Sequence, residues 1–244
     1  MAGNYYLLTS LPTLDALGAE PPMSAAEFAE RVADADGPAE IVRAILLGDD
    51  LLQRDAFLAG ELDQPSPAVL TPAQARNEQP LPEFLAASGA PEDSHTQRST
   101  TDRLWASYFR HAAGLAATRR NAFLSEWVRH EVGLRNALAT ARAKALDLNA
   151  TDYLAAPELG LDAAGFEETV GEWAGATDLV AAQRVLDAAR WQWITSHDAW
   201  FGFGDDELAA YAAKLSLMER WRRLAEAQRE QPDDTDRFAT QADQ

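Results

Sequence analysis

The sequence predicts an all-α protein, a bundle of long antiparallel helices with a Pro-rich connection and a short N-terminal extended segment. Three observations predict this class. Apolar residues recur at three- and four-residue steps over most of residues 101–230, which is the spacing of one helix face. Strict alternation of polar and apolar residues over a strand length is absent after residue 12. Six of the 12 prolines lie between residues 61 and 100, where they prevent long helices.

Composition divides the 244 residues into four regions, which we expect to form one structural domain. A chain of this length buries a sizeable core. The regions are an N-terminal segment with a helical hairpin (1–60), a Pro-rich connection (61–100), the main helical bundle (101–230) and a polar tail expected to be disordered (231–244).

The opening run from Tyr5 to Leu11 is aromatic and apolar and ends at Pro12. Periodicity does not decide over so few residues between an extended segment and one turn of helix. We take the extended form and expect it to be a buried anchor for the N-terminus.

Two helices are expected before the Pro-rich connection. Ser24 and Glu27 have the spacing of a capping box, in which each residue satisfies a free backbone N–H near the helix start. Pro38 suits the first turn of a second helix, because it has no N–H to leave unpaired. The Gly48-Asp49-Asp50 step is a candidate interruption of the apolar stripe of that second helix.

The later helices follow from the same apolar spacing. One begins near Thr101 or Asp102, and a short helix including Leu81–Leu85 is expected to dock before it. Asp162, Asp178 and Asp205 are candidate N-caps. The remaining helices are expected over about 121–146, 162–174, 178–198 and 205–230.

Charge and composition exclude several function classes. Lys and Arg number 21 against 39 Asp and Glu, so the formal net charge is −18. This acidity argues against nucleic acid and against anionic lipid as partners. There is no cysteine for a disulfide, a thiol nucleophile or a Cys-ligated metal. We find no signal-peptide pattern and no apolar run of about 20 residues, so we expect no membrane span.

Motifs for enzymatic chemistry are missing. The sequence lacks GxGxxG, Walker A, GxSxG and HExxH patterns, and it predicts no catalytic residue, no metal ligand and no cofactor. Glu126 and His130 lie one helical turn apart and are the best metal candidates. The Glu-x-x-His spacing of di-iron bundles occurs only at Glu92 and His95, in the Pro-rich connection.

Charged and aromatic residues near the helix at 121–146 are candidates for fixing helix register or for contacting a partner. Glu131 precedes Arg135 by four residues, the order that favours a helical ion pair. Trp191 and Trp193 are two residues apart and do not share a helix face, and one tryptophan is a candidate interface anchor. The candidates are Arg119, Arg120, Trp127, Arg129, Glu131, Arg135, Asn136, Arg142, Trp191 and Trp200.

Four segments spread over residues 4–221 carry a resemblance to a known family. They are Asn4–Pro12 (NYYLLTSLP), Pro21–Phe28, Phe123–Lys144 and Lys214–Trp221. In these segments the chain resembles a small family encoded within bacterial V-type ATPase operons.

The resemblance implies a counterpart of the V/A-type ATPase component that is known as C, or as d in eukaryotes. That component is an all-helical, non-catalytic funnel, which sits on the membrane rotor ring and receives the foot of the central shaft. The implied partners are the central-shaft subunits and the rotor ring, and the implied location is cytoplasmic, held at the membrane through protein contacts. Arg119 and Arg120 become candidates for a rotor or stator contact. The chain departs from the classical funnel protein in being shorter and in its Pro-rich segment.

Two alternatives remain open at this point. One is an assembly or regulatory factor that visits the same ATPase. The other is a helical-bundle metalloenzyme, for which Glu126 and His130 are the residues to test.

Overall fold

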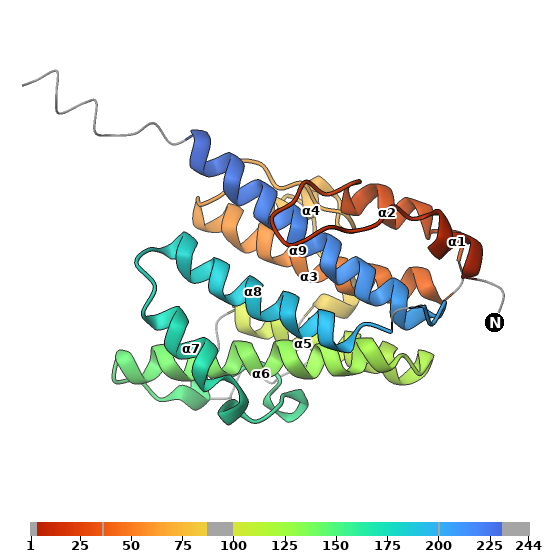
Figure 1. Ribbon diagram of the computed structural model, residues 1–244. Coiled ribbons are helices and arrows are strands. Elements are labelled where there is room, and N and C mark those ends of the chain that lie inside the picture. Colours follow the sequence, from red (N-terminus) through yellow and green to blue (C-terminus); the bar gives the residue numbers. More distant parts are fainter. Residues whose placement is uncertain (1–3, 36, 87–99, 200, 231–244) are drawn as a thin grey trace, which may run out of the picture.

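Five long helices carry the fold of the computed structural model, which describes residues 4–35, 37–86, 100–199 and 201–230 (Figure 1). The described ranges contain no strand, which confirms the predicted all-α class. The long helices are α3 (Pro38–Ala59), α5 (Thr100–Arg119), α6 (Ala122–Ala145), α8 (Leu179–His197) and α9 (Asp205–Glu230). The shorter elements are α1 (Tyr5–Ser10), α2 (Ala25–Arg31), α4 (Pro72–Ala75) and α7 (Glu167–Ala174), with 3-10 turns η1 (Glu83–Leu85), η2 (Ala150–Tyr153), η3 (Pro157–Leu159) and η4 (Ala163–Phe166).

Helix starts follow local signals in the sequence. The predicted capping box forms at α2, where the Ser24 hydroxyl accepts from the Glu27 N–H and the Glu27 carboxylate accepts from the Ser24 N–H. The Asp178 carboxylate accepts from the Ala181 N–H and caps α8. The helix predicted from 162 begins instead as the 3-10 turn η4, and Asp162 caps that turn.

The long helices pack around one large hydrophobic core, and a smaller apolar cluster lies between α6, η4 and α8. Helix α9 lies beside both α3 and α8 (Figure 1). Helix α5 packs against α3 and α6, and α6 also contacts α9. The core side chains come from α2, α3, α5, α6, α8 and α9. None of the helices in the described ranges combines the length and apolarity that a membrane crossing needs.

The N-terminal segment corrects two expectations. Tyr5–Ser10 forms helix α1 rather than an extended segment. It is not a buried anchor, because the Tyr6 side chain is 80% exposed and no residue of α1 is buried. Although the segment is apolar, it lies at the surface. Some of its side chains, among them Leu7 and Leu8, are partly buried against the core.

Helix α3 is continuous through the Gly48-Asp49-Asp50 step, so the candidate interruption is wrong. Both aspartates are buried and have partners. The Asp50 carboxylate accepts from the backbone N–H groups of Ala68, Val69 and Leu70 at 2.7–2.8 Å. The described part of the Pro-rich connection is thereby tied to α3, because these hydrogen bonds satisfy backbone donors that no regular element pairs.

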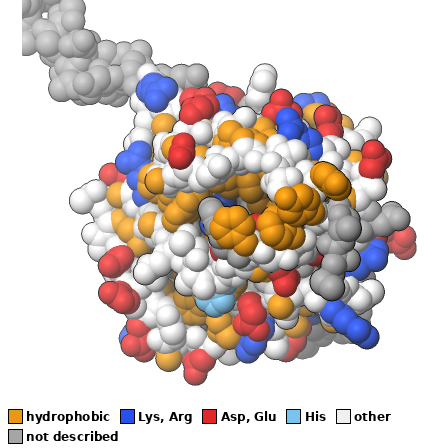
Figure 2. Space-filling model, turned by 45° about the vertical axis from the view of Figure 1, so that its right-hand side comes forward, with side chains coloured by type: hydrophobic (Ala, Val, Ile, Leu, Met, Phe, Trp, Pro, Cys, Tyr) orange, Lys and Arg blue, Asp and Glu red, His pale blue; other side chains and the backbone are white. Residues whose placement is uncertain are grey.

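An exposed group of aromatic rings lies where α1 meets the connection between α8 and α9. We call Tyr5, Tyr6, Phe201 and Phe203 the aromatic patch. The Tyr5 ring lies 5.0 Å from that of Phe203 and 5.6 Å from that of Tyr6, between ring centroids. Figure 2 shows hydrophobic side chains gathered on this end of the molecule. Phe201 and Phe203 have φ values of 61° and 50°, a left-handed conformation that is costly for bulky residues.

Candidate functional site

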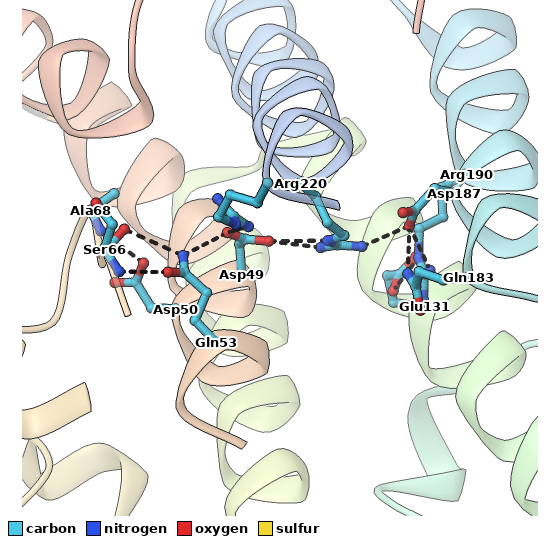
Figure 3. Close-up of polar contacts among 11 residues, drawn as sticks. Asp49, Asp50, Gln53, Ser66, Ala68, Glu131, Gln183, Asp187, Arg190 and Arg220 are labelled. Atoms are coloured by element: carbon cyan, nitrogen blue, oxygen red, sulfur yellow. Dashed lines mark hydrogen bonds and ion pairs between the residues drawn. The ribbon is translucent and has the colours of Figure 1, made fainter. Parts of the chain in front are cut away.

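Buried ion pairs link four helices through the middle of the bundle (Figure 3). Three arginines alternate with three carboxylates, so the set is neutral when all are ionised. We call it the charge chain, and in order it comprises Arg223, Asp49, Arg220, Asp187, Arg190 and Glu131.

Asp49 of α3 is the anchor at one end of the charge chain. Its Oδ1 accepts from Nε and Nη2 of Arg220, both at 3.1 Å, and its Oδ2 accepts from Arg223 Nη2 at 2.6 Å. Gln53, one turn further along α3, donates to the same Oδ2 at 2.9 Å. Both oxygens of this buried carboxylate therefore accept hydrogen bonds, from α9 at Oδ1 and from α3 and α9 at Oδ2.

Asp187 and Arg190 of α8 continue the charge chain to α6. Asp187 Oδ1 accepts from Arg220 Nη1 at 2.8 Å and from Arg190 Nη1 at 3.2 Å. Arg190 Nε then donates to both carboxylate oxygens of Glu131, at 2.8 and 3.1 Å. Gln183 Nε2 donates to Asp187 Oδ1 at 3.0 Å.

Two acids of the charge chain, Glu131 and Asp49, have pKa values below the ordinary range. Burial alone raises the pKa of Glu131, but the Arg190 guanidinium and the His130 side chain lower it by more, to about 2. The pKa of Asp49 is lowered in the same way by Arg223 and Arg220, against burial. Removing one member of such a set leaves a buried charge without compensation, so the charge chain fixes the relative positions of α3, α9, α8 and α6.

The predicted ion pair between Glu131 and Arg135 is wrong. Glu131 points to Arg190 of α8, and Arg135 instead faces α5. The Arg135 guanidinium carbon lies 4.6 Å from the Trp105 ring centroid, and its Nη2 lies 3.7 Å from the Asp102 carboxylate. Each side chain therefore pairs with a group on a facing helix, Glu131 with α8 and Arg135 with α5, and the two do not pair with each other within α6.

A pocket of about 410 Å³ opens between α5, α6 and α8, beside the Glu131 end of the charge chain. We call it the α6 pocket. Its charged lining residues are Asp102, Glu131, Arg135, Arg142 and Arg190. Its apolar walls include Trp105, Leu138, Leu146, Leu148, Tyr153 and Leu186.

Three other predicted residues of α6 have distinct surroundings. Trp127 is buried and packs 5.5 Å from Trp193, so it belongs to the core. The Asn136 amide donates to the Ala155 carbonyl at 3.0 Å and accepts from the Ala155 N–H at 2.9 Å, which holds the loop after α6. Arg142 lies over the Trp173 ring at 5.0 Å.

The basic group near the α5–α6 turn is partly neutralised within the chain. Arg119 pairs with Glu40 at 2.7 Å, and Arg129 pairs with Glu126 at 3.0 Å. Arg120 is exposed and adopts a φ of 54° at the turn.

The remaining tryptophan candidates divide between helix faces. Trp191 is half-buried, with Lys214 Nζ of α9 5.9 Å from its ring centroid. Trp193 turns instead toward α6, as its contact with Trp127 requires. Trp200 lies outside the described residues.

The metal candidates on α6 do not converge. Glu126 is engaged with Arg129 on the surface, whereas His130 is buried with its Nδ1 3.6 Å from Glu131. Within the part of the chain that the structure describes, no group of three or more histidine or carboxylate side chains is arranged to hold a metal ion.

Comparison with known proteins places the chain in a family. No curated protein and no solved structure matches it. Residues 68–232 match the family described as "Protein of unknown function (DUF2764)". That span includes α6, α8 and α9, and with them the α6 pocket arginines and five of the six charge-chain residues. Because the match covers more than half of the sequence, the chain belongs to the DUF2764 family.

Proposed function

We propose that this protein is a non-catalytic, C/d-like component of a bacterial V/A-type ATPase, coupling the central shaft to the membrane rotor ring. The observation that carries the proposal is the aromatic patch. Tyr6 and Phe201 are 80% and 70% exposed, and contiguous apolar surface of this kind marks protein interaction sites. Tyr5 and Tyr6 also belong to the segment that resembles the V-type ATPase operon family.

Backbone strain supports a docking role for the aromatic patch. A left-handed φ at a bulky residue costs on the order of 1 kcal/mol or more. Phe201 and Phe203 both adopt it, although Gly202 between them is the residue best suited to that conformation. The Phe201 ring is exposed at this strained turn and the Phe203 ring is half-buried against Tyr5, and a partner surface would bury the exposed ring.

The charge chain suits the mechanical part of the proposal. A component that transmits torque has to keep its helices in fixed register under load. Close-packed interiors transmit strain, and buried ion pairs between α3, α9, α8 and α6 resist sliding of one helix past another.

The test is affinity purification from gently solubilised native membranes through a tag at the C-terminus. We expect central-shaft and rotor-ring subunits of a V/A-type ATPase to be recovered with the wild-type protein. The double variant Tyr6→Ser with Phe201→Ser should lower that recovery at least tenfold, because hot-spot aromatics carry much of an interface's energy. Mass spectrometry and gel densitometry identify and count the recovered proteins.

The matched control is Leu179→Ser, at the start of α8 and away from the aromatic patch. Leu179 is 86% exposed, so this change also replaces an exposed apolar side chain by serine. It should leave recovery unchanged. If wild-type protein is recovered alone, or if both variants behave alike, the proposed docking surface is incorrect.

An assembly or regulatory factor of the same ATPase is the second candidate. The aromatic patch supports this candidate equally, because an exposed apolar surface indicates that a partner binds there but does not indicate whether the complex is permanent or transient. The two differ in copy number, because a permanent component is recovered in a fixed ratio and a visiting factor is not.

A further inference from the structure

Two arginines of the α6 pocket, the half-buried Arg135 and the exposed Arg142, use none of their N–H groups in hydrogen bonds to the residues that the structure describes. Arg135 and Arg142 are seven residues apart, about 10.5 Å along the axis of α6, and both line the pocket. Neither guanidinium donates a hydrogen bond to any described residue, whereas Arg190 in the same pocket donates three. A guanidinium carries five N–H donors in a planar fork that matches a carboxylate or phosphate.

Each of the two guanidinium groups makes a cation–π contact with a tryptophan ring. Arg135 lies over Trp105 and Arg142 over Trp173, at 4.6 and 5.0 Å from the ring centroids. Contact with a ring face holds a guanidinium in place without using its N–H groups. The donors at the edges are thereby left available to a ligand.

Burial and a neighbouring cation both act against the positive charge of Arg135. Burial lowers the pKa of Arg135, and the positive charge of Arg142 adds to that effect, while Asp102 and Asp55 act in the opposite sense. The closest carboxylate contact of Arg135 is 3.7 Å, longer than a hydrogen bond. An anion placed between the two arginines would relieve their repulsion.

The mouth of the α6 pocket is apolar. Leu146 is 68% exposed and Leu148 is 47% exposed, although both are large hydrophobic side chains. With Leu138 and Tyr153 they form a wall of the pocket. The volume of about 410 Å³ lies within the roughly 300–1,000 Å³ typical of small-molecule sites, which combine apolar walls with a few polar groups.

We propose that the α6 pocket binds a small amphipathic oxyanion, whose head group is held by Arg135 and Arg142 and whose apolar body lies along Leu138, Leu146 and Leu148. The head group is a carboxylate or a phosphate, since both accept the guanidinium fork. This site is separate from the aromatic patch, so it does not depend on the proposed function.

The experiment uses the full chain and four probes in isothermal titration calorimetry: decanoate, decyl phosphate, decanol and butyrate, all below their aggregation concentrations. We expect saturable binding of one or both ten-carbon anions, with affinity at least tenfold above that of decanol and of butyrate. Tighter binding of decyl phosphate would assign the head group as a phosphate, and tighter binding of decanoate as a carboxylate. Tryptophan fluorescence gives a second readout, because Trp105 and Trp173 lie beneath the two guanidinium groups.

The deciding variant is Arg135→Gln with Arg142→Gln, which should weaken binding of the preferred anion by about tenfold or more, the effect of losing charge-assisted hydrogen bonds. Arg129→Gln, also on α6 but paired with Glu126 on the surface, is the matched control and should bind like wild type. Circular dichroism and thermal melting establish that the variants are folded. Equal binding of decanol and the anions, no binding of either anion, or unchanged affinity in the folded double variant would overturn the proposal.

Discussion

The charge chain and the α6 pocket both contain arginines, but they use them in opposite ways. In the charge chain, Arg220 donates three hydrogen bonds to two buried carboxylates. In the pocket, Arg135 and Arg142 rest on tryptophan rings and donate no hydrogen bond to a described residue. The first arrangement engages all three nitrogens of the guanidinium with buried carboxylates, and the second keeps the donors available. The difference separates residues that hold the fold from residues that are free to take a ligand.

The largest expected effect comes from breaking the charge chain at Arg220. Arg220→Met leaves Asp49 and Asp187 with less compensation in the interior, and removing one partner of a buried pair costs about 3–5 kcal/mol. Urea unfolding measures the change. Arg222→Met, on the same helix, removes an exposed pair with Glu226 at 2.9 Å and should cost less than about 1 kcal/mol. Similar losses for both variants would contradict a structural role for the charge chain.

Acid should weaken the charge chain through Glu131. The pKa of Glu131 is about 2 in the folded protein, against an ordinary value of 4.5. The stability that it contributes is therefore present above about pH 4.5 and is lost as the pH falls toward 2, on the order of 3 kcal/mol in all. Urea unfolding at several pH values over this window measures the slope. Glu131→Gln should flatten the slope, and an unchanged slope would contradict the assignment.

Packing beside the charge chain is tight, and two glycines test it. A Cβ added at Gly48 would lie 2.7 Å from the Tyr108 hydroxyl oxygen, which donates to the Ala44 carbonyl. Gly48→Ala should cost about 1–3 kcal/mol. Gly114→Ala, in helix α5 with no atom within 4 Å of the added Cβ, should gain about 0.5–1 kcal/mol. Thermal melting compares the two, and a shift of the same sign in both would argue against this difference in packing.

Arg135→Met is expected to destabilise the protein far less than Arg220→Met. Because Arg135 donates no hydrogen bond to a described residue and its Asp102 contact is long, its loss should change the free energy of unfolding by less than about 1.5 kcal/mol. The same urea experiment applies. If Arg135→Met lowered the free energy of unfolding as much as Arg220→Met, Arg135 would be a structural residue, and the proposed difference between the charge chain and the α6 pocket would be wrong.

Local features of the fold were predictable from the sequence, and long-range pairings were not. The caps at Ser24 and Asp178 depend on neighbours within three residues, so one sequence suffices to find them. Asp49 looked like a helix interruption because its partner Arg220 lies 171 residues further along. An aspartate inside an apolar stripe indicates that a buried charge needs a partner. The packing of α3 on α9 is needed to identify that partner as an arginine of α9.

The candidate site followed the same division. The sequence indicates Glu131 and Arg135 as candidates for fixing helix register or for contacting a partner, but it does not show their partners on other helices, because helix spacing relates only neighbours within α6. The N-terminal segment failed for another reason. Seven residues do not show a period, and its aromatic residues belong to the surface rather than to the core.

The most direct test of the proposed function is a count of copies in the intact ATPase. The V/A-type ATPase is purified from native membranes through a tag on its catalytic head, and quantitative mass spectrometry measures this protein relative to the shaft subunits. We predict a fixed ratio that survives each purification step. A substoichiometric amount that declines during purification, or complete absence, would contradict a permanent component that couples the shaft to the rotor ring.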